Sequence, residues 1–327
     1  MITCEVTIER WQMIEVFAIS RGAIDDIGVI LVTLTDANGV RGRGEAAGVD
    51  YDGETPESMR AQVESVRAKL HDGLTGEELL ELLPAGGARN ALDCALWDLR
   101  AKQTGVPVWQ AAGLPRPKPV TTCITIGLGS EADTRRKARE SRGYPVIKIK
   151  LDATRHVDVV RIVREELPTA RLLVDANQAW TRAQLEALTP ALVALGVELI
   201  EQPVSRHDDR SLDGFVSPLP LAADESCTDR ASLGALARRY RYTNIKLDKC
   251  GGLTEALAMQ REATRLGLGL MVGNMCGTSL AMAPGFLIAQ ACTFTDLDGP
   301  LLQRLDRDAP IRFEHGVMSV PSPALWG

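Results

Sequence analysis

Short apolar segments of strand length recur between residues 120 and 300 and alternate with stretches of helical pattern. HVDVVRIVREEL (156–167) and LTEALAMQREATRLG (253–267) are typical of amphipathic helices. Strands that alternate with helices predict a parallel sheet. Eight such units of even length favour an α/β fold closed into a (β/α)8 TIM-type barrel over the alternative, a doubly wound open sheet. The apolar segments are 120–126, 146–151, 171–177, 197–203, 219–225, 243–249, 268–274 and 294–300.

The first 115 residues have a different pattern, which predicts a small α+β domain. A β-rich run, a turn at 36–39 and a second β-rich run indicate antiparallel strands. Two helical stretches follow, TPESMRAQVESVRAKL (55–70), with Thr55 as its N-cap, and ARNALDCALWDLRAKQTG (88–105), which ends at a glycine. We therefore expect an α+β domain over residues 1–115 and a barrel over residues 116–327.

Charge and composition exclude several classes of protein. A formal net charge of −6 argues against a nucleic-acid partner, because such proteins usually carry a basic face. The start, MITCEVTIERWQMIEV (1–16), alternates apolar and polar residues like a strand rather than a signal peptide, and apolar runs are too short to span a bilayer. Seven cysteines without a C-x-x-C pair suit reduced thiols. We expect a cytoplasmic protein with neither a nucleic-acid nor a membrane partner.

Polar residues fall at the same place in successive strand–helix units. Lys150, Asp175, Glu201, Asp224 and Lys246 each lie at or near the end of an apolar segment, with 22 to 26 residues between neighbours. The carboxyl ends of barrel strands open on one mouth, where barrel enzymes keep their active sites. We therefore expect these five side chains to converge there.

Asp175, Glu201 and Asp224 are the predicted ligands of a metal ion. Three carboxylates on adjacent strands repel one another unless a cation lies between them. Their hard oxygen atoms select Mg²⁺, which prefers octahedral geometry and keeps positions open for substrate. Any one of these acids alone is as readily an ordinary residue at a strand end, but three in register make that interpretation much weaker.

Lys150 and Lys246 lie on the second and sixth predicted strands, across the barrel mouth from each other. A substrate carbon between them would have an amine on either face, so that one neutral lysine removes a proton while the other, protonated, returns one to the opposite side. We expect burial, the neighbouring ammonium and Mg²⁺ to lower a lysine pKa toward working pH. Lys148 is expected to stay charged and stabilise a developing oxyanion, to pair with a ligand carboxylate, or to do both.

An ordered set of motifs runs along the chain: K-x-K (Lys148, Lys150), D-x-N (Asp175, Asn177), IEQP (Glu201), ADES (Asp224) and NIKLDKCGG (Lys246). Through this set the chain resembles the enolase superfamily, in its muconate-lactonizing subgroup. Superfamily sites combine a lysine or histidine base with Mg²⁺ that stabilises an ene-diolate. The resemblance, rather than the spacing, implies this mechanism and a capping function for residues 1–115, with specificity loops there and a C-terminal tail that returns to the cap.

Further motifs are similar to those of the dipeptide epimerases in this subgroup. FTDLDGP (294–300) contains Asp296 and Asp298 on one face of the eighth predicted strand, and in those enzymes such a pair holds the ammonium of the N-terminal residue. AISRGAIDD (18–26) contains Arg21, in the cap loop that meets the glutamate side-chain carboxylate in L-Ala-D/L-Glu epimerases. LPAGGARNALDCALWDLRAK (83–102) also resembles the corresponding helix of bacterial L-Ala-D/L-Glu epimerases.

The resemblance implies a Mg²⁺-dependent isomerase that epimerises the α-carbon of the C-terminal residue of a dipeptide, L-Ala-D/L-Glu first, in the use of murein peptides. Tyr51 and Arg21 would lie on closing cap loops, and Asn177 would contact substrate. Alternatives are an N-acyl amino acid racemase, which needs no ammonium site, a cycloisomerase or lyase of the same subgroup, and a barrel that only binds anions. The alternative for Asp296 and Asp298 is that they only end a strand before a turn, and homo-oligomerisation stays open.

Overall fold

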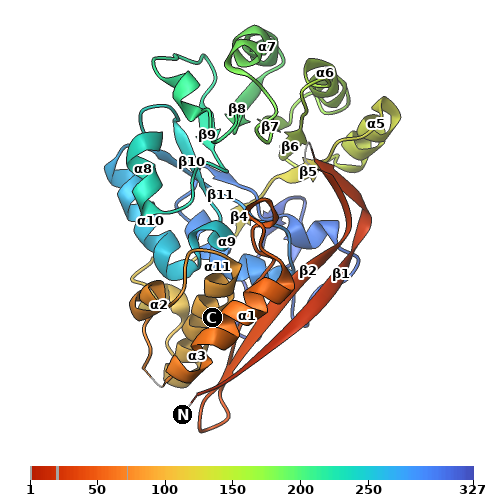
Figure 1. Ribbon diagram of the computed structural model, residues 1–327. Coiled ribbons are helices and arrows are strands. Elements are labelled where there is room, and N and C mark those ends of the chain that lie inside the picture. Colours follow the sequence, from red (N-terminus) through yellow and green to blue (C-terminus); the bar gives the residue numbers. More distant parts are fainter. Residues whose placement is uncertain (1, 20–21, 72) are drawn as a thin grey trace.

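Antiparallel strands and short helices form the N-terminal part of the structure, a computed structural model that describes residues 2–19, 22–71 and 73–327. The strand β2 (Gly22–Thr35) pairs with β1 (Thr3–Ile19) on one side and with β3 (Arg41–Ala46) on the other. Helices pack against one face of this sheet (Figure 1), because alternate residues such as Val32 and Leu34 are apolar and fully buried. The helices are α1 (Pro56–Val66), α2 (Gly76–Leu82), α3 (Gly87–Thr104) and α4 (Val108–Ala111), with 3-10 turns η1 (Asp50–Asp52) and η2 (Arg67–Lys69).

Local signals explain where the cap helices begin and end. The Thr55 hydroxyl accepts a hydrogen bond from the Ser58 backbone N–H, and the Ser58 hydroxyl accepts one from the Thr55 N–H, so that a capping box starts α1. The helix α3 ends at Gly105, whose φ of 69° lies in the left-handed region. The two predicted helices of the N-terminal region are therefore confirmed.

Parallel strands form the second part of the structure and close into a ring (Figure 1). Within the described residues, eight strands pair in chain order, and the Cys123 N–H donates to the Thr295 carbonyl at 2.9 Å, which joins the last strand to the first. The predicted (β/α)8 barrel is confirmed, and the open-sheet alternative is wrong. The strands are β5 (Ile124–Ile126), β6 (Val146–Lys150), β7 (Arg171–Asp175), β8 (Val197–Glu201), β9 (Leu221–Ala223), β10 (Tyr242–Ile245), β11 (Gly269–Val272) and β12 (Phe294–Thr295).

Helices cover the outside of the barrel strands. In α6, Val159, Val160 and Val163 recur at helical spacing and are buried against the strands. Side chains of Ser130 and Thr181 cap the starts of α5 and α7. The helices around the barrel are α5 (Glu131–Glu140), α6 (Val157–Glu166), α7 (Arg182–Ala194), α8 (Arg230–Leu236), α10 (Leu253–Arg265) and α11 (Ser279–Ala289), with the 3-10 turn η3 (Asp209–Leu212).

All eight strands of the described barrel are shorter than the apolar segments that indicated them, and in three of these segments another element follows or precedes the strand. The strand β10 ends at Ile245, and a one-turn helix, α9 (Leu247–Cys250), follows. The strand β12 ends at Thr295, because the 3-10 turn η4 (Gly299–Leu302) begins soon afterwards at a Gly-Pro pair. The segment 120–126 contains β5 but also β4 (Val120–Thr121), which pairs with β14 (Val317–Met318) outside the barrel. That outer sheet is completed by β13 (Phe313–Glu314).

The C-terminal residues lie against the cap. The Trp326 Nε1–H donates to the Cys94 carbonyl at 3.0 Å, and the Gly327 N–H donates to Asp98 Oδ1 at 2.8 Å. Arg43 on β3 donates to the Leu325 carbonyl at 2.7 Å. The last residues of the chain are therefore hydrogen-bonded to both the sheet and the helix α3 of the cap.

Two general expectations concern thiols and membranes. The seven cysteines all fall within the described residues, and each has a free thiol in the structure. Every helix in the described ranges is too short or too polar to cross a bilayer.

Candidate active site

Side chains that point into the barrel form layers, because residues i and i+2 of a strand face the same side. One buried layer is apolar and includes Val146, Leu173, Leu199 and Ala222. The next layer toward the carboxyl ends of the strands is polar, so the change from apolar to charged occurs at one level around the barrel. Each of its members lies two residues beyond a member of the apolar layer: Lys148, Asp175, Glu201, Asp224 and Asp296.

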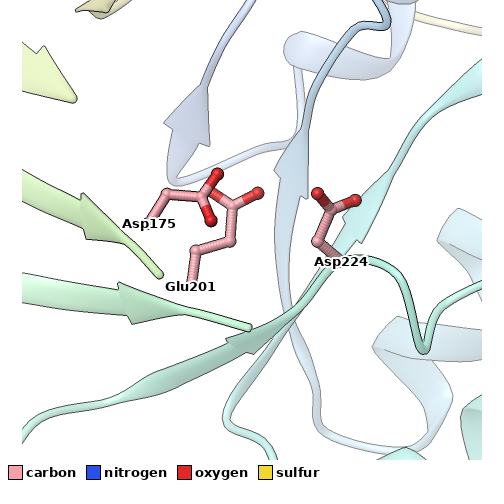
Figure 2. Close-up of side chains that lie close together, drawn as sticks. All are labelled: Asp175, Glu201 and Asp224. Carbon is pink, nitrogen blue, oxygen red and sulfur yellow. The ribbon is translucent and has the colours of Figure 1, made fainter. Parts of the chain in front are cut away.

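Asp175, Glu201 and Asp224 bring three carboxylates together in that polar layer. Figure 2 shows the three groups pointing toward one another from neighbouring strands. One oxygen atom from each lies within 4.8 Å of the others, and all three residues are fully buried. The strand register explains the arrangement, because Asp175 and Glu201 are direct partners in the β7–β8 pair.

Lys148 holds the acids of this layer together. Its Nζ lies 3.0 Å from Asp175 Oδ2, 2.7 Å from Glu201 Oε2 and 2.7 Å from Asp296 Oδ2. Burial disfavours its charge, but Asp296, Glu201 and Asp175 outweigh that effect and raise the Lys148 pKa well above its usual value. Lys148 therefore stays charged and pairs with two of the predicted metal ligands.

The charge of the whole site fits a divalent cation. Burial and then the Asp175 carboxylate raise the pKa of Glu201 to about 8, as expected where acids outnumber nearby cations. Fully ionised, six buried acids and four buried lysines of the described mouth leave two negative charges, which one divalent ion balances. The donor set of carboxylate oxygens suits Mg²⁺. These residues are Asp175, Glu201, Asp224, Glu225, Asp296 and Asp298, with Lys148, Lys150, Lys246 and Lys249.

Lys150 and Lys246 lie on either side of the acid triad. Lys150 is the last residue of β6, and its Nζ donates to Asp175 Oδ2 at 2.7 Å. Lys246 follows β10, and its Nζ donates to Asp224 Oδ2 at 2.8 Å. The two amines therefore bond to the first and the third acid of the triad, one on each side of Glu201.

The expected lowering of a lysine pKa does not occur at Lys246 in this structure. Burial opposes its charge, but the ion pair with Asp224 outweighs burial and raises the Lys246 pKa above its usual value. The same pair explains Asp224, where burial is outweighed by Lys246 and Lys249 and the pKa falls well below its usual value. The sequence showed the neighbouring ammonium but not this direct bond to a carboxylate, and the predicted lowering, which includes the charge of Mg²⁺, stays a prediction.

Asp296 and Asp298 lie just beyond β12 rather than within a strand, which corrects the predicted position. Asp296 Oδ1 accepts from the Cys123 thiol at 3.2 Å, in addition to the Lys148 pair. Asp298 Oδ2 accepts from the Thr125 N–H at 2.7 Å, on the first barrel strand. Burial and then the Asp296 charge raise the pKa of Asp298 to about 7, so the two acids are close enough to repel each other.

The remaining predicted contacts come from the barrel and the cap. Asn177 follows β7 with a φ of 42°, and its N–H donates to Asp175 Oδ1 at 2.8 Å. Tyr51 belongs to η1, and the Arg206 guanidinium lies 5.4 Å from its ring centroid, which places this cap turn over the segment after β8. Arg21 lies outside the described residues. The preceding Ala18 carbonyl accepts from Leu128 N–H at 2.8 Å, so that β1 meets the barrel just after β5.

Two residues at the triad were not identified from the sequence. Asn244 Nδ2 donates to Glu201 Oε1 at 2.8 Å, and Lys249 Nζ donates to Asp224 Oδ1 at 2.6 Å. Asn244 lies on β10, two residues before Lys246, which directly follows the strand, so the alternation of strand faces was a signal for it. Lys249 had no such signal, because it reaches Asp224 only through the unpredicted turn of α9.

Acids suited to a divalent ion, with an amine on either side, define a capped barrel enzyme equipped for metal-assisted proton transfer. The chain belongs to the enolase superfamily. The N-terminal domain model of mandelate racemase and muconate lactonizing enzyme matches residues 1–113, and the enolase C-terminal domain-like model matches residues 131–324.

Two relatives with named activities are an epimerase and a racemase. The L-Ala-D/L-Glu epimerase of Escherichia coli (strain K12) is 40% identical over 97% of this chain and 99% of its own length. The N-acetyl-D-glutamate racemase of a Pseudoalteromonas species is 42% identical over 76% of this chain and 79% of its own.

Solved structures of related enzymes have the same fold. An enolase family member from Agrobacterium tumefaciens, described as homologous to dipeptide epimerases and solved with sodium and L-Ala-L-Glu, gives a TM-score of 0.97 at 40% identity over all of both chains. A dipeptide epimerase from Methylococcus capsulatus, complexed with Mg and L-Arg-D-Lys, gives a TM-score of 0.92 at 31% identity over 99% of both chains.

Proposed function

We propose that the protein is a Mg²⁺-dependent dipeptide epimerase that inverts the α-carbon of the C-terminal residue, with L-Ala-D/L-Glu as its substrate. The observation that carries the proposal is the position of Lys150 and Lys246, each bonded to an outer acid of one buried triad. A substrate carboxylate bound at that triad would place its α-carbon between the two amines. The named relatives that share the fold over nearly the whole chain support the same class of reaction.

Asp175, Glu201 and Asp224 would hold Mg²⁺, with Asn244 and Lys249 orienting two of the ligands. When bound, this ion supplies a Lewis acid that withdraws charge from the substrate α-carboxylate and acidifies the α-hydrogen. The Lys148 ammonium, fixed between the acids, would stabilise the negative charge that develops on the carboxylate oxygen atoms.

Lys150 and Lys246 would exchange the α-proton through the enolate. One of them, as a neutral amine, takes the proton from the α-carbon, and the other, as an ammonium, returns a proton to the opposite face. Each lysine changes roles when the epimer is the substrate. If Asp224 binds a metal ion instead of Lys246, the Lys246 ammonium would lose this ion pair. The pKa of Lys246 would then fall toward the working pH.

The ends of the dipeptide would be held by opposite charges. Asp296 and Asp298 are two close, buried acids, and we propose that they bind the N-terminal ammonium, in agreement with the raised pKa of Asp298. Arg21 would bind the distal carboxylate of a glutamyl residue. Tyr51 and Asn177 would line the substrate from the cap turn and the β7 end, with residues 1–115 acting as the cap that supplies these loops and residues 116–327 as the barrel. Use of murein peptides in the cytoplasm is the setting that we propose.

An N-acyl amino acid racemase is the second candidate, because the racemase from Pseudoalteromonas is 42% identical over 76% of this chain. Such a substrate has no ammonium, so it would not need Asp296 and Asp298 as a cation site. Both candidates share the triad and the two lysines.

The test is a panel of dipeptides and N-acetylglutamate, incubated with enzyme and Mg²⁺ in D₂O and analysed by mass spectrometry. We expect L-Ala-L-Glu to gain one deuterium and to become a mixture of epimers. We expect the Asp296→Asn, Asp298→Asn double variant to lose this activity. Exchange into N-acetylglutamate alone would show that the proposed substrate is wrong, and exchange into neither would refute the proposed chemistry.

A further inference from the structure

Lys246 begins a short helix that lies between the strand β10 and a much longer helix. It is the N-cap residue of α9, and the next helix, α10, starts only three residues after α9 ends. A helix of one turn is unfavourable by itself, because few hydrogen bonds offset the ordering of its backbone. The position of α9, and with it the start of the Lys246 side chain, therefore depends on contacts from other parts of the chain.

Arg89 of the cap helix α3 closes the carboxyl end of α9. Its guanidinium donates from Nη2 to the Cys250 carbonyl at 2.6 Å and from Nε to the Gly251 carbonyl at 3.1 Å. The third contact, from Nη1 to the Leu83 carbonyl at 3.0 Å, ties the same group to the cap. Carbonyl groups at the end of a helix lack partners within it, and a cation there also suits the helix dipole. Arg89 therefore supplies hydrogen-bond donors for these carbonyl groups that α9 itself does not provide.

Asp93 lies one turn further along α3 and caps the start of α10. Its Oδ2 accepts from the Thr254 N–H at 2.9 Å, and its Oδ1 accepts from the Thr254 hydroxyl at 2.6 Å. The N-cap residue of α10 is Gly252, which has no side chain that could accept these bonds. Asp93 is 1% exposed, so this cap comes from the other domain and is shielded from water.

Gly251 and Gly252 allow α3 to come this close. A Cβ atom on Gly251 would collide with the Arg89 guanidinium, and one on Gly252 would lie 2.5 Å from Asp93 Oδ2. Their φ values of 76° and 119° also favour glycine. The glycine pair of the NIKLDKCGG motif is thus explained by the contact with the cap helix.

The helix α9 is also joined to the cap loop and to the acid triad. Asp248 Oδ1 accepts from the Gly48 N–H at 2.8 Å, in the loop that leads to Tyr51. Lys249 contacts Asp224 on the opposite side, as described above. One turn of helix therefore connects the cap, the lysine at its start and a carboxylate of the triad, and α3 fixes its far end.

We infer that Arg89 and Asp93 are positioning residues for Lys246. The inference rests on the proposed two-lysine proton transfer and adds to it a function for the cap helix. Neither residue lies at the triad, so both act through α9 and α10. Lys150 is held in a different way, by the pairing of β6 with its neighbouring strands. Loosening α9 should therefore slow the proton transfers that involve Lys246 and spare abstraction by Lys150.

The experiment measures α-deuterium incorporation in D₂O with Mg²⁺, starting separately from L-Ala-L-Glu and from L-Ala-D-Glu. Lys150→Ala and Lys246→Ala first identify the epimer from which each lysine removes the proton. Arg89→Met and Asp93→Asn are then compared with the wild type. We expect each to slow abstraction from the Lys246-dependent epimer by about 10-fold to 100-fold, the range typical of a misplaced reacting group. Abstraction from the other epimer should stay within about threefold, since that lysine is not displaced.

Arg43→Met is the matched control, because it also removes an arginine that joins the cap to backbone carbonyls, at Leu325 instead of at α9. It should change the exchange of both epimers equally. Circular dichroism establishes that each variant folds. Asp93→Asn is nearly isosteric and decides the question if Arg89→Met does not fold.

Equal slowing of both epimers in folded Arg89→Met and Asp93→Asn would overturn the inference while leaving the proposed function intact. A wild-type enzyme that exchanges neither dipeptide would overturn the proposed function, and the inference with it. Slowing of only the Lys246-dependent epimer, absent in Arg43→Met, would support the positioning role.

Discussion

The two sides of the barrel mouth hold their lysines by different means. Lys150 is the last residue of β6, paired in register with Asp175 of β7, so that the sheet itself fixes its backbone. Lys246 lies past the end of β10, at the start of a one-turn helix whose far end is bonded to Arg89 of the cap. One side is built from the barrel alone, and the other from barrel and cap together.

This difference shows that the cap does more than cover the substrate. The bonds of Arg89 and Asp93 are buried, and they join the cap to α9 and α10 rather than to the acid triad. They therefore support the Lys246 side of the site from the cap. Changes in the cap should alter the Lys246 side of the reaction first.

Removing either lysine is the change with the largest expected effect on activity. The expected loss is the same for the lysine on each side of the barrel mouth. Lys150→Ala and Lys246→Ala should each reduce epimerisation of L-Ala-L-Glu by about 10³-fold or more, because a positioned general acid or base contributes about 10²–10⁴-fold. Polarimetry or chiral chromatography measures the loss. A variant that keeps near-normal epimerisation would show that one amine serves both faces.

Asn244→Leu tests the support that the Lys246 strand gives to the metal site. The substitution removes the hydrogen bond to Glu201 Oε1 and leaves that oxygen buried. We expect the affinity for Mg²⁺ to fall by about 10-fold to 100-fold, as is usual when the partner of a metal ligand is lost. Isothermal titration, or electron paramagnetic resonance with Mn²⁺, measures the binding directly.

Thr243→Val is the control for this variant. Thr243 precedes Asn244 on the same strand but faces the other way, where its hydroxyl donates to the Cys227 sulfur. Its loss should leave the metal affinity unchanged. Equal affinity in Asn244→Leu and the wild type would mean that Glu201 does not need this support.

The smallest effect on catalysis is expected at Asp248, in the interface between cap and barrel, where a substitution should have a clear effect on stability. Burial raises the pKa of Asp248 to about 7, although the Gly48 N–H favours the charged form. Above its unfolded pKa near 4, the unfolded chain releases this proton while the folded chain keeps it. Asp248 should therefore lower the stability of the wild type, relative to a side chain that does not titrate, as pH rises from about 4 to 7, by on the order of 4 kcal/mol, and this effect should then level off.

Asp248→Asn should remove this contribution to the slope, because the amide does not titrate. Urea denaturation of both proteins across that pH range measures the difference in the free energy of unfolding. Parallel curves for the two proteins would contradict the buried, protonated state of Asp248. A difference confined to pH above 8 would contradict it as well.

The same comparison explains how much the sequence could predict. Lys150, Asp175 and Glu201 are the last residues of continuous strands. The regular spacing of the strand–helix units and the alternation of side chains along each strand were therefore sufficient to predict that these residues converge. The turn of α9 was missed, because Leu247 follows Ile245 at the two-residue spacing of a strand. Only the tertiary contact with α3 decides between helix and strand there.

Other misses also arose from contacts distant in sequence. Arg89 lies 161 residues before Cys250, and nothing local marks it as more than a polar position on a helix. The direct bond of Lys246 to Asp224 was missed when the lysine pKa was predicted from the neighbouring charges. Asp296 and Asp298 were placed within a strand, whereas the turn at Gly299 ends that strand early.

The most direct test is a crystal structure of the enzyme with Mg²⁺ and L-Ala-L-Glu. We predict the α-carbon of the glutamyl residue between Lys150 and Lys246, with each Nζ about 3–3.5 Å away on opposite faces, as reacting atoms require. The α-carboxylate should meet the ion held by the three acids. Both amines on one face of the carbon, or either one turned away from it, would contradict the two-lysine mechanism.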